Sequence, residues 1–559
     1  MAQDKILIHQ IGGTEVLEVS DTDSAYFNSD HSIIYFTING ITSEFAVNDI
    51  DSITFEPVAD STVSIEYNGT AATVINPLEN AGVDVTVNAA DVCIYASAAA
   101  AGVSYVVSGT TDDGMLKFYF EESFNLLLNN ADITINDGPA VNIQSKKKAW
   151  VNLVPGTLNT LTDGLVYADP AVEGEDQKAA FFSEGEMIFN SSGSLVIHGK
   201  GSDQHAIRSD EYIRIIDGNI TVSSAVKDGI HGKEGLFMNG GTVSIASSGD
   251  GVDGNEGIVE ITGGILSIHS SDNDVNAILT FIDGFMTLSN SGSGGKGIIT
   301  DGDLVIGGAM TSPVIDVTTS GNKIQISSGG GGGGPGPPGP GDDGKYDKAK
   351  TVKSDGSVVI NSGRVSVSSS DDGFNATYGN GGEQNDGSQL SINGGYCYLS
   401  ASEGDPVDSN GNISIAGGTT VVHGPRSDPE VGMDVNGSCI ISGGFLVISG
   451  TNSNMTEGAS NSSTQNSLLV RSNNSIPADT IFRIEDEYGT DIVTFAPSRT
   501  YYSIVFSSPD LTVGTAYTIY TGGTCTGEDE NGLYTRGTYT GGSFRKSFVT
   551  SGTVTNVSL

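Results

Sequence analysis

The sequence predicts an all-β protein whose central part is a parallel β-helix, a solenoid of short stacked strands. The chain of 559 residues contains 77 glycines together with many Ser, Thr, Asn, Val and Ile residues, a composition typical of strands joined by tight turns. A glycine-led strand motif also recurs: the glycines at 193, 218, 241, 264 and 284 are 25, 23, 23 and 20 residues apart. A unit this short cannot bury a core by itself, so neighbouring units must stack.

Each copy of the motif continues with alternating apolar and small polar residues. Apolar residues occupy the second and fourth positions after the glycine, as in Val243 and Ile245, or Leu266 and Ile268. Successive strand residues face opposite sides, so these residues are predicted to point into a shared core. A propeller blade would need roughly 40–45 residues, and a leucine-rich repeat would show a Leu/Asn consensus. The copies are GNITVSS, GTVSIAS, GILSIHS, GFMTLSN, GRVSVSS, GYCYLSA, GTTVVHG and GFLVISG, starting at residues 218, 241, 264, 284, 363, 395, 418 and 444.

Three segments are predicted from the pattern. Residues 1–57 form a small β module that is duplicated, because IGGTEVLEVSDTDSAYF returns as INGITSEFAVNDIDSITF. Residues 58–465 form the β-helix, interrupted by a Gly/Pro-rich loop at 329–344 that is too irregular for a collagen triple helix. Residues 466–559 read as ordinary alternating strands and are predicted to be a C-terminal β-sheet that caps the open end of the solenoid.

The charge balance narrows the choice of partners. The formal net charge is -43, from 25 Lys and Arg against 68 Asp and Glu. This surplus excludes nucleic acids and favours cations, because phosphates would be repelled over most of the surface. No stretch approaches the roughly 20 apolar residues of a membrane span, and residues 1–10 do not have the pattern of a signal peptide. Either the protein is intracellular or a signal sequence has been removed. The composition is typical of extracellular proteins, so we expect an extracellular or outer-surface protein whose signal sequence has been removed.

Aspartates and asparagines align in the turns before the glycine-led strands. One predicted column holds Asp228, Asp250, Asn273, Asp372 and Asp405, and a second, three positions on, holds His231, Asp253, Asn276, Asn375, Asp408 and Asn436. Carboxylates stacked about 4.8 Å apart repel one another unless a cation lies between them. Oxygen-rich turns of this kind suit Ca²⁺, although Asp and Asn also occur there simply to form turns and side-chain ladders. The sequence predicts several calcium sites, with ligands drawn from Asp228, Asp250, Asp253, Asp272, Asp274, Asp371, Asp372, Asp405 and Asp408.

Two further groups of residues are candidates for carbohydrate binding. A basic stretch contains Lys200, Arg208, Lys227, His231 and Lys233, which could bind carboxylates or could balance the acidic turns. The aromatic residues Phe285, Tyr396, Tyr398 and Phe445 occupy outward strand positions. Their rings could stack on sugars, or they could be covered by the Gly/Pro-rich loop or by the terminal segment.

Part of the chain carries a family resemblance. The run NNADITINDGPAVNIQSKKKAWVNLVPGTLNTLTDG at 129–164 and the run from Asp176 to Gly235 resemble a family of carbohydrate-binding β-helix proteins of cellulosome-type and gut bacteria. The resemblance spans roughly 60–525 and is specific through 125–280. It implies a right-handed parallel β-helix that is related in fold to pectate lyases, holds calcium, and binds polygalacturonate and cellulose. Residues 1–57 resemble an N-terminal module common on Bacteroidetes-type surface lipoproteins.

The resemblance departs from the lyases at the residues that matter for catalysis. Those enzymes hold calcium with an Asp on one coil and a DDxxD-like set on the next, and use a Lys as base. Asp228, Asp250 and Asp253 match part of the set, but Gly249 replaces one Asp, and no Lys or Arg lies between Glu234 and Gly295, which leaves only Lys296 as a displaced base. We therefore expect non-catalytic, calcium-dependent binding of acidic, uronate-rich plant-type polysaccharide. A polysaccharide lyase, and a structural adhesin or fibre subunit that self-associates, remain alternatives.

Overall fold

The computed structural model describes residues 5–10, 13–18, 22–28, 32–38, 41–56, 62–325, 346–379 and 384–559. Within these ranges the chain is all-β, with three short 3-10 helices and no α-helix, which confirms the predicted class. The Gly/Pro-rich loop predicted at 329–344 lies outside the described residues. None of the described helices is long and apolar enough to cross a membrane.

The chain divides into two compact units, Met1–Thr221 and Val222–Leu559. The first unit begins with two antiparallel three-stranded sheets, in the orders β2-β1-β6 and β3-β4-β5. Their shared core includes Ile8, Phe36 and Phe45. The strands are β1 (Lys5–Gln10), β2 (Gly13–Glu18), β3 (Thr22–Phe27), β4 (Ile33–Ile38), β5 (Ile41–Ala46) and β6 (Ile50–Glu56).

The rest of the first unit is built mainly from parallel pairs between strands that are two or three elements apart. For example, β11 pairs with β13, and β13 pairs with both β15 and β16. Before them, β9 and β10 are antiparallel. The strands named are β9 (Val83–Asn88), β10 (Asp91–Ala96), β11 (Ser104–Thr111), β13 (Phe124–Thr134), β15 (Ala149–Leu153) and β16 (Leu158–Thr162).

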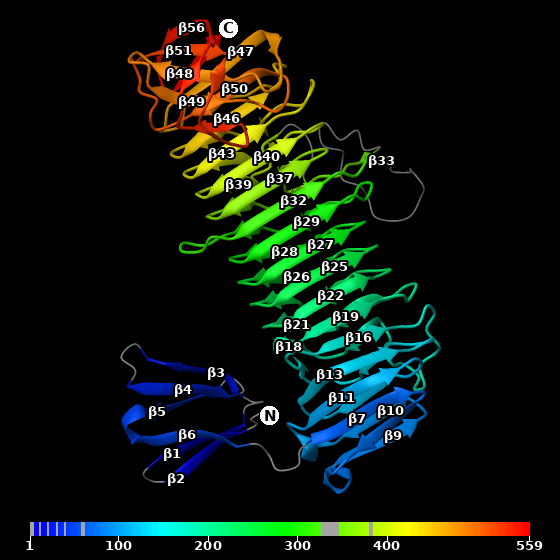
Figure 1. Ribbon diagram of the computed structural model, residues 1–559. Helices are drawn as coiled ribbons and strands as arrows, with labels where there is room; N and C mark the ends of the chain where they lie inside the picture. Colours follow the sequence, from blue (N-terminus) through cyan, green and yellow to red (C-terminus); the bar gives the residue numbers. More distant parts are fainter. Residues whose placement is uncertain are drawn as a thin grey trace. The chain divides into compact units, whose positions relative to one another are not determined.

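The chain of the second unit repeats in coils, which are successive segments of about 20 to 50 residues. Each coil contributes strands to three parallel ladders (Figure 1). The first ladder is β23 (Ile230–Gly232), β26 (Val252–Ile261), β28 (Val275–Phe281), β30 (Ile298–Thr300), β35 (Val352–Ser354), β38 (Phe374–Ala376), β41 (Val407–Ser409) and β44 (Asp434–Val435). The second shares β26 and β28 and adds β24 (Gly235–Met238), β31 (Leu304–Ile306), β36 (Val358–Ile360), β39 (Gln389–Ile392), β42 (Asn412–Ile415) and β45 (Cys439–Ile441). The third is β25 (Thr242–Ser247), β27 (Ile265–Ser270), β29 (Phe285–Asn290), β32 (Val314–Thr319), β37 (Arg364–Ser369), β40 (Tyr396–Ala401), β43 (Thr419–His423) and β46 (Phe445–Gly450).

Seven of the eight strands of the third ladder are glycine-led strands found in the sequence, and the other, β32, follows Pro313. Its predicted inward residues are buried: Val243, Leu266 and Ile268 are each no more than 3% exposed. The register stacks like on like, since Val243 pairs with Leu266 and Leu266 pairs with Met286. The alternating pattern therefore produces one apolar interior that continues from coil to coil.

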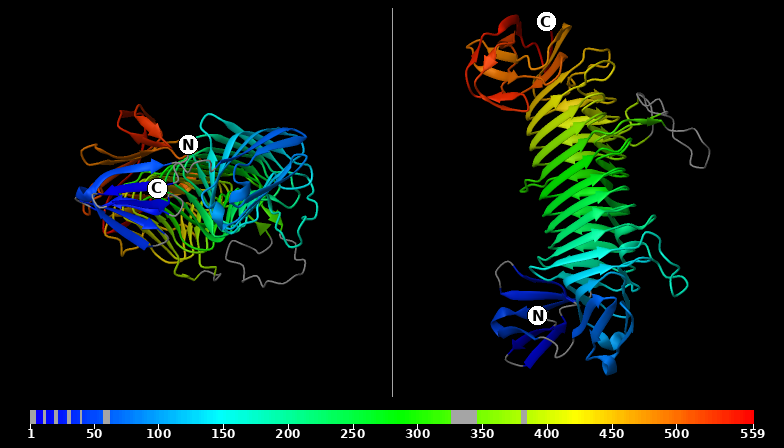
Figure 2. Two further views of the ribbon diagram at one scale, coloured as in Figure 1. Left: turned by 90° about the horizontal axis from the view of Figure 1, so that it is seen from below. Right: turned by 45° about the vertical axis from the view of Figure 1, so that its right-hand side comes forward.

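After β46 most strand pairs are antiparallel, although β57 (Val554–Ser558) pairs in parallel with β47 (Ser467–Ile476). Strand β50 (Tyr501–Ser507) pairs with both β46 and β47, and a six-stranded sheet follows in the order β53-β54-β49-β48-β51-β56. This region lies at the end of the last coils (Figure 2). A hydrophobic core that includes Phe482, Phe495 and Phe506 joins it to them, with Val421 and Val447 contributing from β43 and β46. The remaining strands are β48 (Phe482–Asp486), β49 (Asp491–Phe495), β51 (Ala516–Thr521), β53 (Glu528–Glu530), β54 (Leu533–Thr535) and β56 (Ser543–Val549). The division into 1–57, 58–465 and 466–559 stays a prediction.

Candidate functional site

A column of stacked residues runs along the turns that join the third ladder to the first ladder. Backbone hydrogen bonds link each coil to the next at this position, for example from Gly229 N to Asp250 O and from Gly373 N to Asp405 O. Two lysines that the sequence alignment omitted, Lys296 and Lys350, lie in the middle. We call this set the turn column, and in order it holds Asp228, Asp250, Asn273, Lys296, Lys350, Asp372 and Asp405.

A second column lies in the first-ladder strands. The register stacks His231, Asp253, Asn276, Ile299, Lys353, Asn375, Asp408 and Asp434. The prediction of Asn436 at the end of this column is wrong, because Asp434 pairs with Asp408. The last turn has a different length from the earlier ones, and an alignment anchored on glycines misses this shift of two residues.

Carboxylates of the turn column accept backbone hydrogen bonds from the next coil. Asp228 Oδ1 accepts from Asp250 N at 3.0 Å, and Asp372 Oδ1 accepts from Asp405 N at 2.9 Å. A glycine precedes each donor because there is no room for a side chain. A Cβ on Gly249 would lie 2.6 Å from Asp228 Oδ1, and one on Gly404 would lie 2.4 Å from Asp372 Oδ1. These aspartates therefore hold adjacent coils together, whatever else they bind.

At the start of the second unit, a histidine lies among the predicted calcium ligands. His231 Nδ1 is 2.8 Å from Asp253 Oδ2 and 3.6 Å from Asp228 Oδ2. Asp250 accepts from Asn273 and Asn276 side chains at 2.9 Å, and burial raises the pKa of its carboxyl to about 6. Because a ring nitrogen lies between the carboxylates and Ca²⁺ prefers oxygen ligands, this group fits calcium poorly.

Asp272 and Asp274 flank the turn column but differ in environment. Asp272 is exposed, and its Oδ1 accepts from the side chain of Asn273 at 3.2 Å. Asp274 is fully buried, with Oδ1 accepting from Ser270 N at 3.1 Å and Ser270 Oγ at 2.8 Å. Its Oδ2 is buried without a hydrogen-bond partner, and burial raises the pKa of this carboxyl to about 7. Asp274 belongs to the interior of its coil.

Further along, four carboxylates gather on two adjacent coils. We call Asp371, Asp372, Asp405 and Asp408 the acidic turn cluster. Two lysines that were not predicted here partly neutralise it. Lys350 Nζ lies 2.7 Å from Asp372 Oδ2, and Lys348 Nζ lies 3.5 Å from Asp371 Oδ1. The sequence could have indicated these lysines, because the run KYDKAK precedes a first-ladder strand and Lys350 stands at the position of the turn column.

The acidic turn cluster has more negative charge than its lysines can balance. Burial, reinforced by Asp372 and Asp408, raises the pKa of Asp405 to about 10. Burial and Asp372 also raise the pKa of Asp371 and of Asp408. Although burial opposes ionisation, Lys350 lowers the pKa of Asp372. Without an added cation, the cluster therefore retains protons at neutral pH.

The donor chemistry of the acidic turn cluster fits a hard cation. All its ligand atoms are oxygens, and Asp371 Oδ2 is buried with no hydrogen-bond partner. Asp408 Oδ2 accepts from Asn375, and Asp405 Oδ1 accepts from Val431 N at 2.5 Å, which fixes both side chains. Ca²⁺ prefers six to eight oxygens from carboxylates and carbonyls. Among the predicted calcium ligands, the acidic turn cluster therefore suits Ca²⁺ better than the group around His231 does.

The predicted basic residues fall in both units. Lys200 is exposed and Arg208 is half-buried in the first unit, where Arg208 Nε donates to Asp210 Oδ1 at 3.0 Å. In the second unit, Lys227 and Lys233 are exposed and His231 is buried. Lys296, the displaced lyase base, is 7% exposed, and its Nζ donates to Gly294 O at 2.8 Å.

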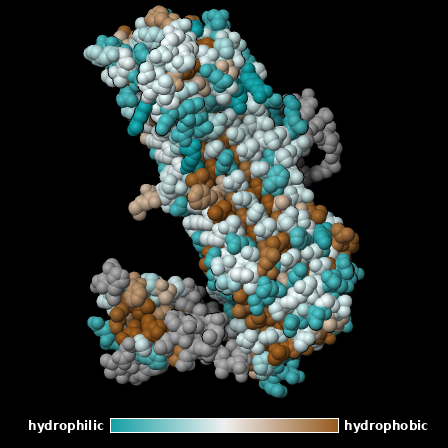
Figure 3. All heavy atoms as spheres, viewed as in Figure 1, coloured by the Kyte–Doolittle hydropathy of each residue, from teal (hydrophilic) through white to brown (hydrophobic). Residues whose placement is uncertain are grey.

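The outward face of the third ladder carries an apolar stripe. Ile265, Phe285 and Val314 stack in register on β27, β29 and β32, and Ile265 and Phe285 are 44% and 57% exposed. Apolar side chains gather over these strands in the view of Figure 3. Further along the ladder, Arg364 lies over the Tyr396 ring at 4.6 Å, and Asn531 Nδ2 donates to the Tyr396 hydroxyl at 3.1 Å.

The terminal region therefore contacts two of the predicted aromatic residues. Tyr396 contacts Asn531, and the ring of Phe445 packs edge-on against Phe506 with centroids 5.4 Å apart. Phe285 remains open, and Tyr398 lines a pocket. The turn column runs along the carboxyl-terminal ends of the third-ladder strands, whereas Ile265, Phe285 and Val314 are the first residues of theirs, so the stripe and the column lie at opposite ends of the strands.

Parallel ladders with an open face and a carboxylate-rich edge define the class of protein: an all-β protein with a large, mostly parallel sheet. The family described as carbohydrate-binding domain-containing protein matches residues 88–405, more than half of the chain, and the chain belongs to this family.

Parts of the chain are also similar to a curated relative and to a solved structure. A carbohydrate-binding domain-containing protein of Acetivibrio thermocellus is 26% identical over 122 residues, which is 22% of this chain and 42% of that relative. The match thus spans less than half of the relative's length. A solved structure described as the polysaccharide lyase-like protein from C. thermocellum, as a gadolinium derivative, is 22% identical with a TM-score of 0.34, and covers 47% of this chain and 99% of that chain.

Proposed function

We propose that this protein binds acidic, uronate-rich polysaccharide without cleaving it, and that calcium held by turn carboxylates takes part in binding. The observation that carries the proposal is the acidic turn cluster, where four carboxylates face two lysines and Asp371 Oδ2 is left without a partner. A chain with a net charge of -43 would otherwise repel an anionic polymer. A bound cation offers a way to join protein and ligand carboxylates.

The proposal includes the architecture of the binding face. The three ladders are interpreted as the faces of a right-handed parallel β-helix, with coils stacked at about 4.8 Å. A sugar chain lying over Ile265, Phe285 and Val314 would follow the amino-terminal ends of the third-ladder strands, and the turn column follows their carboxyl-terminal ends. The apolar stripe would contact the faces of the sugar rings, and the acidic turn cluster, which follows the later strands β37 and β40, would bind uronate carboxylates as a separate contact.

Asp371, Asp405 and Asp408 are the residues that would hold calcium. When bound, the ion would supply positive charge at the edge of the face and coordinate a uronate carboxylate. Asp372 has a different task, because its two oxygens are engaged by Lys350 and by the backbone of Asp405. Lys350 remains charged, since the carboxylates around it raise its pKa against the effect of burial.

The contacts of the two lysines in the turn column support binding over β-elimination. A lyase base must reach the proton on C5 of the sugar. Lys296 is buried and donates to a carbonyl of its own turn, and Lys350 is paired with Asp372. We also propose that the protein acts at the cell surface or outside the cell, with cellulose as a further polysaccharide partner.

The test is a glycan array with the full-length chain, in calcium and in chelator. We expect binding to polygalacturonate in calcium and its loss in chelator. Asp371→Asn should weaken the calcium-dependent signal, while Asp272→Asn, which changes an exposed carboxylate outside the cluster, should not. Binding to polygalacturonate that is equal with and without calcium would contradict the proposal.

A further inference from the structure

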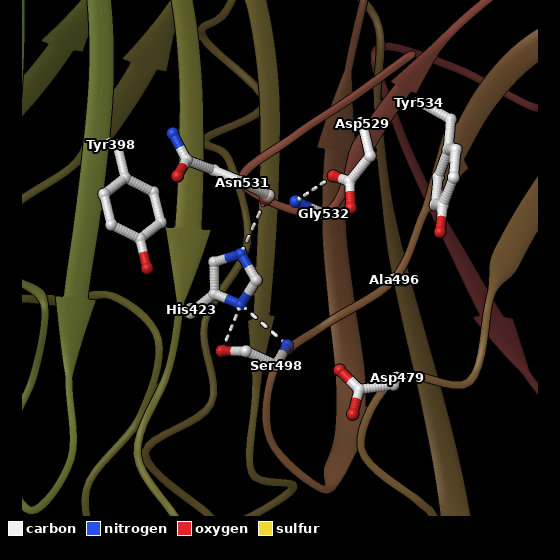
Figure 4. A pocket seen from close by; sticks show the side chains of 9 residues that line it. All are labelled: Tyr398, His423, Asp479, Ala496, Ser498, Asp529, Asn531, Gly532 and Tyr534. Atoms are coloured by element: carbon white, nitrogen blue, oxygen red, sulfur yellow. Dashed lines mark hydrogen bonds between the residues drawn. The ribbon is translucent and has the colours of Figure 1, made fainter. Parts of the chain in front are cut away.

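A pocket lies where the C-terminal region meets the last coils of the second unit (Figure 4). Its volume is about 390 Å³, within the roughly 300–1,000 Å³ of small-molecule sites. Tyr398 and His423 come from β40 and β43 of the third ladder, Asp479 comes from the turn before β48, and the other lining residues come from the segments around β49, β53 and β54. The lining consists of Tyr398, His423, Asp479, Ala496, Ser498, Asp529, Asn531, Gly532 and Tyr534.

His423 ties the walls of this pocket together. The backbone N–H of Ser498 donates to His423 Nδ1 at 2.8 Å. Nδ1 is therefore the acceptor, so Nε2 carries the hydrogen and donates to Asn531 O at 2.9 Å. Burial lowers the pKa of His423, which keeps the ring neutral. One buried side chain thus holds both the loop at 498 and the loop at 531 against the ladder, and the pocket is preformed.

The side chains that line the pocket are of the kinds that recognise sugars. Tyr398 and Tyr534 are half-buried and offer aromatic faces and hydroxyls. Asp479 and Asp529 are exposed carboxylates that can accept hydrogen bonds from hydroxyl groups. Asp529 is held in place, because its Oδ1 accepts from Gly532 N at 2.7 Å. Asp479 is held by its backbone N–H, which donates to Pro497 O at 2.8 Å.

The charge of the lining selects among sugars. Two of its nine residues are carboxylates, and none of the nine is Lys or Arg. The two carboxylates would repel a uronate carboxylate. A neutral sugar carries hydroxyls that can donate hydrogen bonds to both. The pocket is also separate from the acidic turn cluster, since it is lined by outward residues of β40 and β43 and by terminal loops.

We infer that this pocket is a second carbohydrate site, which binds a neutral sugar unit and does not require calcium. It lies on the same ladder as the apolar stripe, toward the C-terminal coils. The protein would then have two sites of opposite selectivity, one for uronates along the turn edge and one for neutral sugars in the pocket. The inference assigns a site to a neutral polysaccharide partner such as the cellulose proposed above, and it does not depend on the calcium-dependent binding of uronates.

The test uses the full-length chain in chelator, with neutral hexasaccharides of β-1,4-glucan, β-1,4-mannan and β-1,4-xylan as probes. Titration calorimetry and saturation-transfer NMR measure binding. We expect at least one probe to bind, and Tyr534→Ala to weaken it about tenfold or more through loss of ring contact. Asp479→Asn should weaken it as well, and Asn tolerates the positive φ of 59° at this position. Tyr488→Ala is the matched control, since this tyrosine is 85% exposed and outside the pocket.

The result that overturns the inference is the failure of every neutral probe to bind at millimolar concentration, or binding that Tyr534→Ala leaves unchanged. Calcium-dependent binding of polygalacturonate is measured on the same variants and should be unaffected by Tyr534→Ala. If neutral probes bind through Tyr534 while polygalacturonate does not bind, the pocket is supported and the function proposed for the turn cluster is wrong.

Discussion

The backbone N–H of Asp405 donates to Oδ1 of Asp372 at 2.9 Å, so an aspartate on one coil holds the backbone of the next. The same arrangement joins Asp228 and Asp250 at 3.0 Å. Asp372 therefore supports the fold as well as contributing charge. Substitutions meant to probe calcium should avoid such residues, and Asp371 is the better choice because its Oδ2 has no partner to lose.

Calcium is the first prediction. Protein purified in calcium should retain the ion, and chelation should lower the melting temperature, because a ligand at 100 times its Kd stabilises the folded state by about 2.7 kcal/mol. Asp371→Asn should reduce the effect of chelation, and Asp272→Asn should preserve it. Elemental analysis and thermal melts measure these outcomes. An identical melting curve in calcium and in chelator would contradict the prediction.

The second prediction concerns the close approach of neighbouring coils. Gly404→Ala would place a Cβ 2.4 Å from Asp372 Oδ1, so the coil contact must open. We expect a loss of about 2 kcal/mol or more in the free energy of unfolding. Gly552→Ala is the control, since a Cβ there meets no atom within 4 Å. Denaturant titrations measure the free energy of unfolding of both variants. Equal values would contradict the prediction, since they would show that neighbouring coils can move apart at no cost.

The pH dependence of stability is the third prediction, and it rests on Asp274. Burial raises its pKa to about 7 in the folded protein, from 3.8. Between these pH values the folded state binds a proton at Asp274 that the unfolded state does not bind. The contribution of Asp274 to the free energy of unfolding is therefore complete below about pH 4 and is lost as the pH rises through 7. Relative to Asp274→Asn, which stays neutral, the wild type should lose about 2 kcal/mol between pH 5 and pH 8.

That comparison is made by chemical denaturation of both proteins in chelator, which separates the titration of Asp274 from metal binding. Asp272→Asn serves as the control, because Asp272 is exposed. A difference between wild type and Asp274→Asn that stays constant across this range would mean that Asp274 does not titrate there.

Catalysis is the fourth prediction. Incubation with polygalacturonate and calcium should yield no unsaturated product, as followed by ultraviolet absorbance, because Lys296 is buried and hydrogen-bonded to Gly294. Product that accumulates with the wild type and disappears with Lys296→Ala would establish the lyase alternative instead.

The fifth prediction separates the apolar stripe from the acidic turn cluster. Phe285→Ser removes an exposed ring from the third ladder without touching the core, since its inward neighbour Met286 is unchanged. We expect polysaccharide binding in pull-downs to weaken by about tenfold, because a ring contact is lost. The melting temperature should be unchanged. Val513→Ser, a half-exposed residue outside the ladder, is the control. Wild-type binding by Phe285→Ser would place recognition on another face.

The sequence alone was sufficient for the class of fold and for the stacking of the glycine-led strands. Positions such as Val243 and Leu266 alternate with small polar residues, and that local pattern determines which side of a strand faces the core. The sequence also placed Asp228, Asp250, Asp372 and Asp405 in one column, because they stand at the same offset from the repeated motifs.

Only the tertiary structure decided what lies beside those residues. Lys350 reaches the column after a long insertion, and Asp434 replaces Asn436 because the last turn changes length, so neither follows from a fixed repeat. Asp272 and Asp274 are two residues apart, yet one faces solvent and the other the interior. The pocket at Tyr398 needs loops more than 50 residues away in sequence. Local periodicity specifies strands and their faces, whereas charge balance, burial and pockets depend on which distant segments pack together.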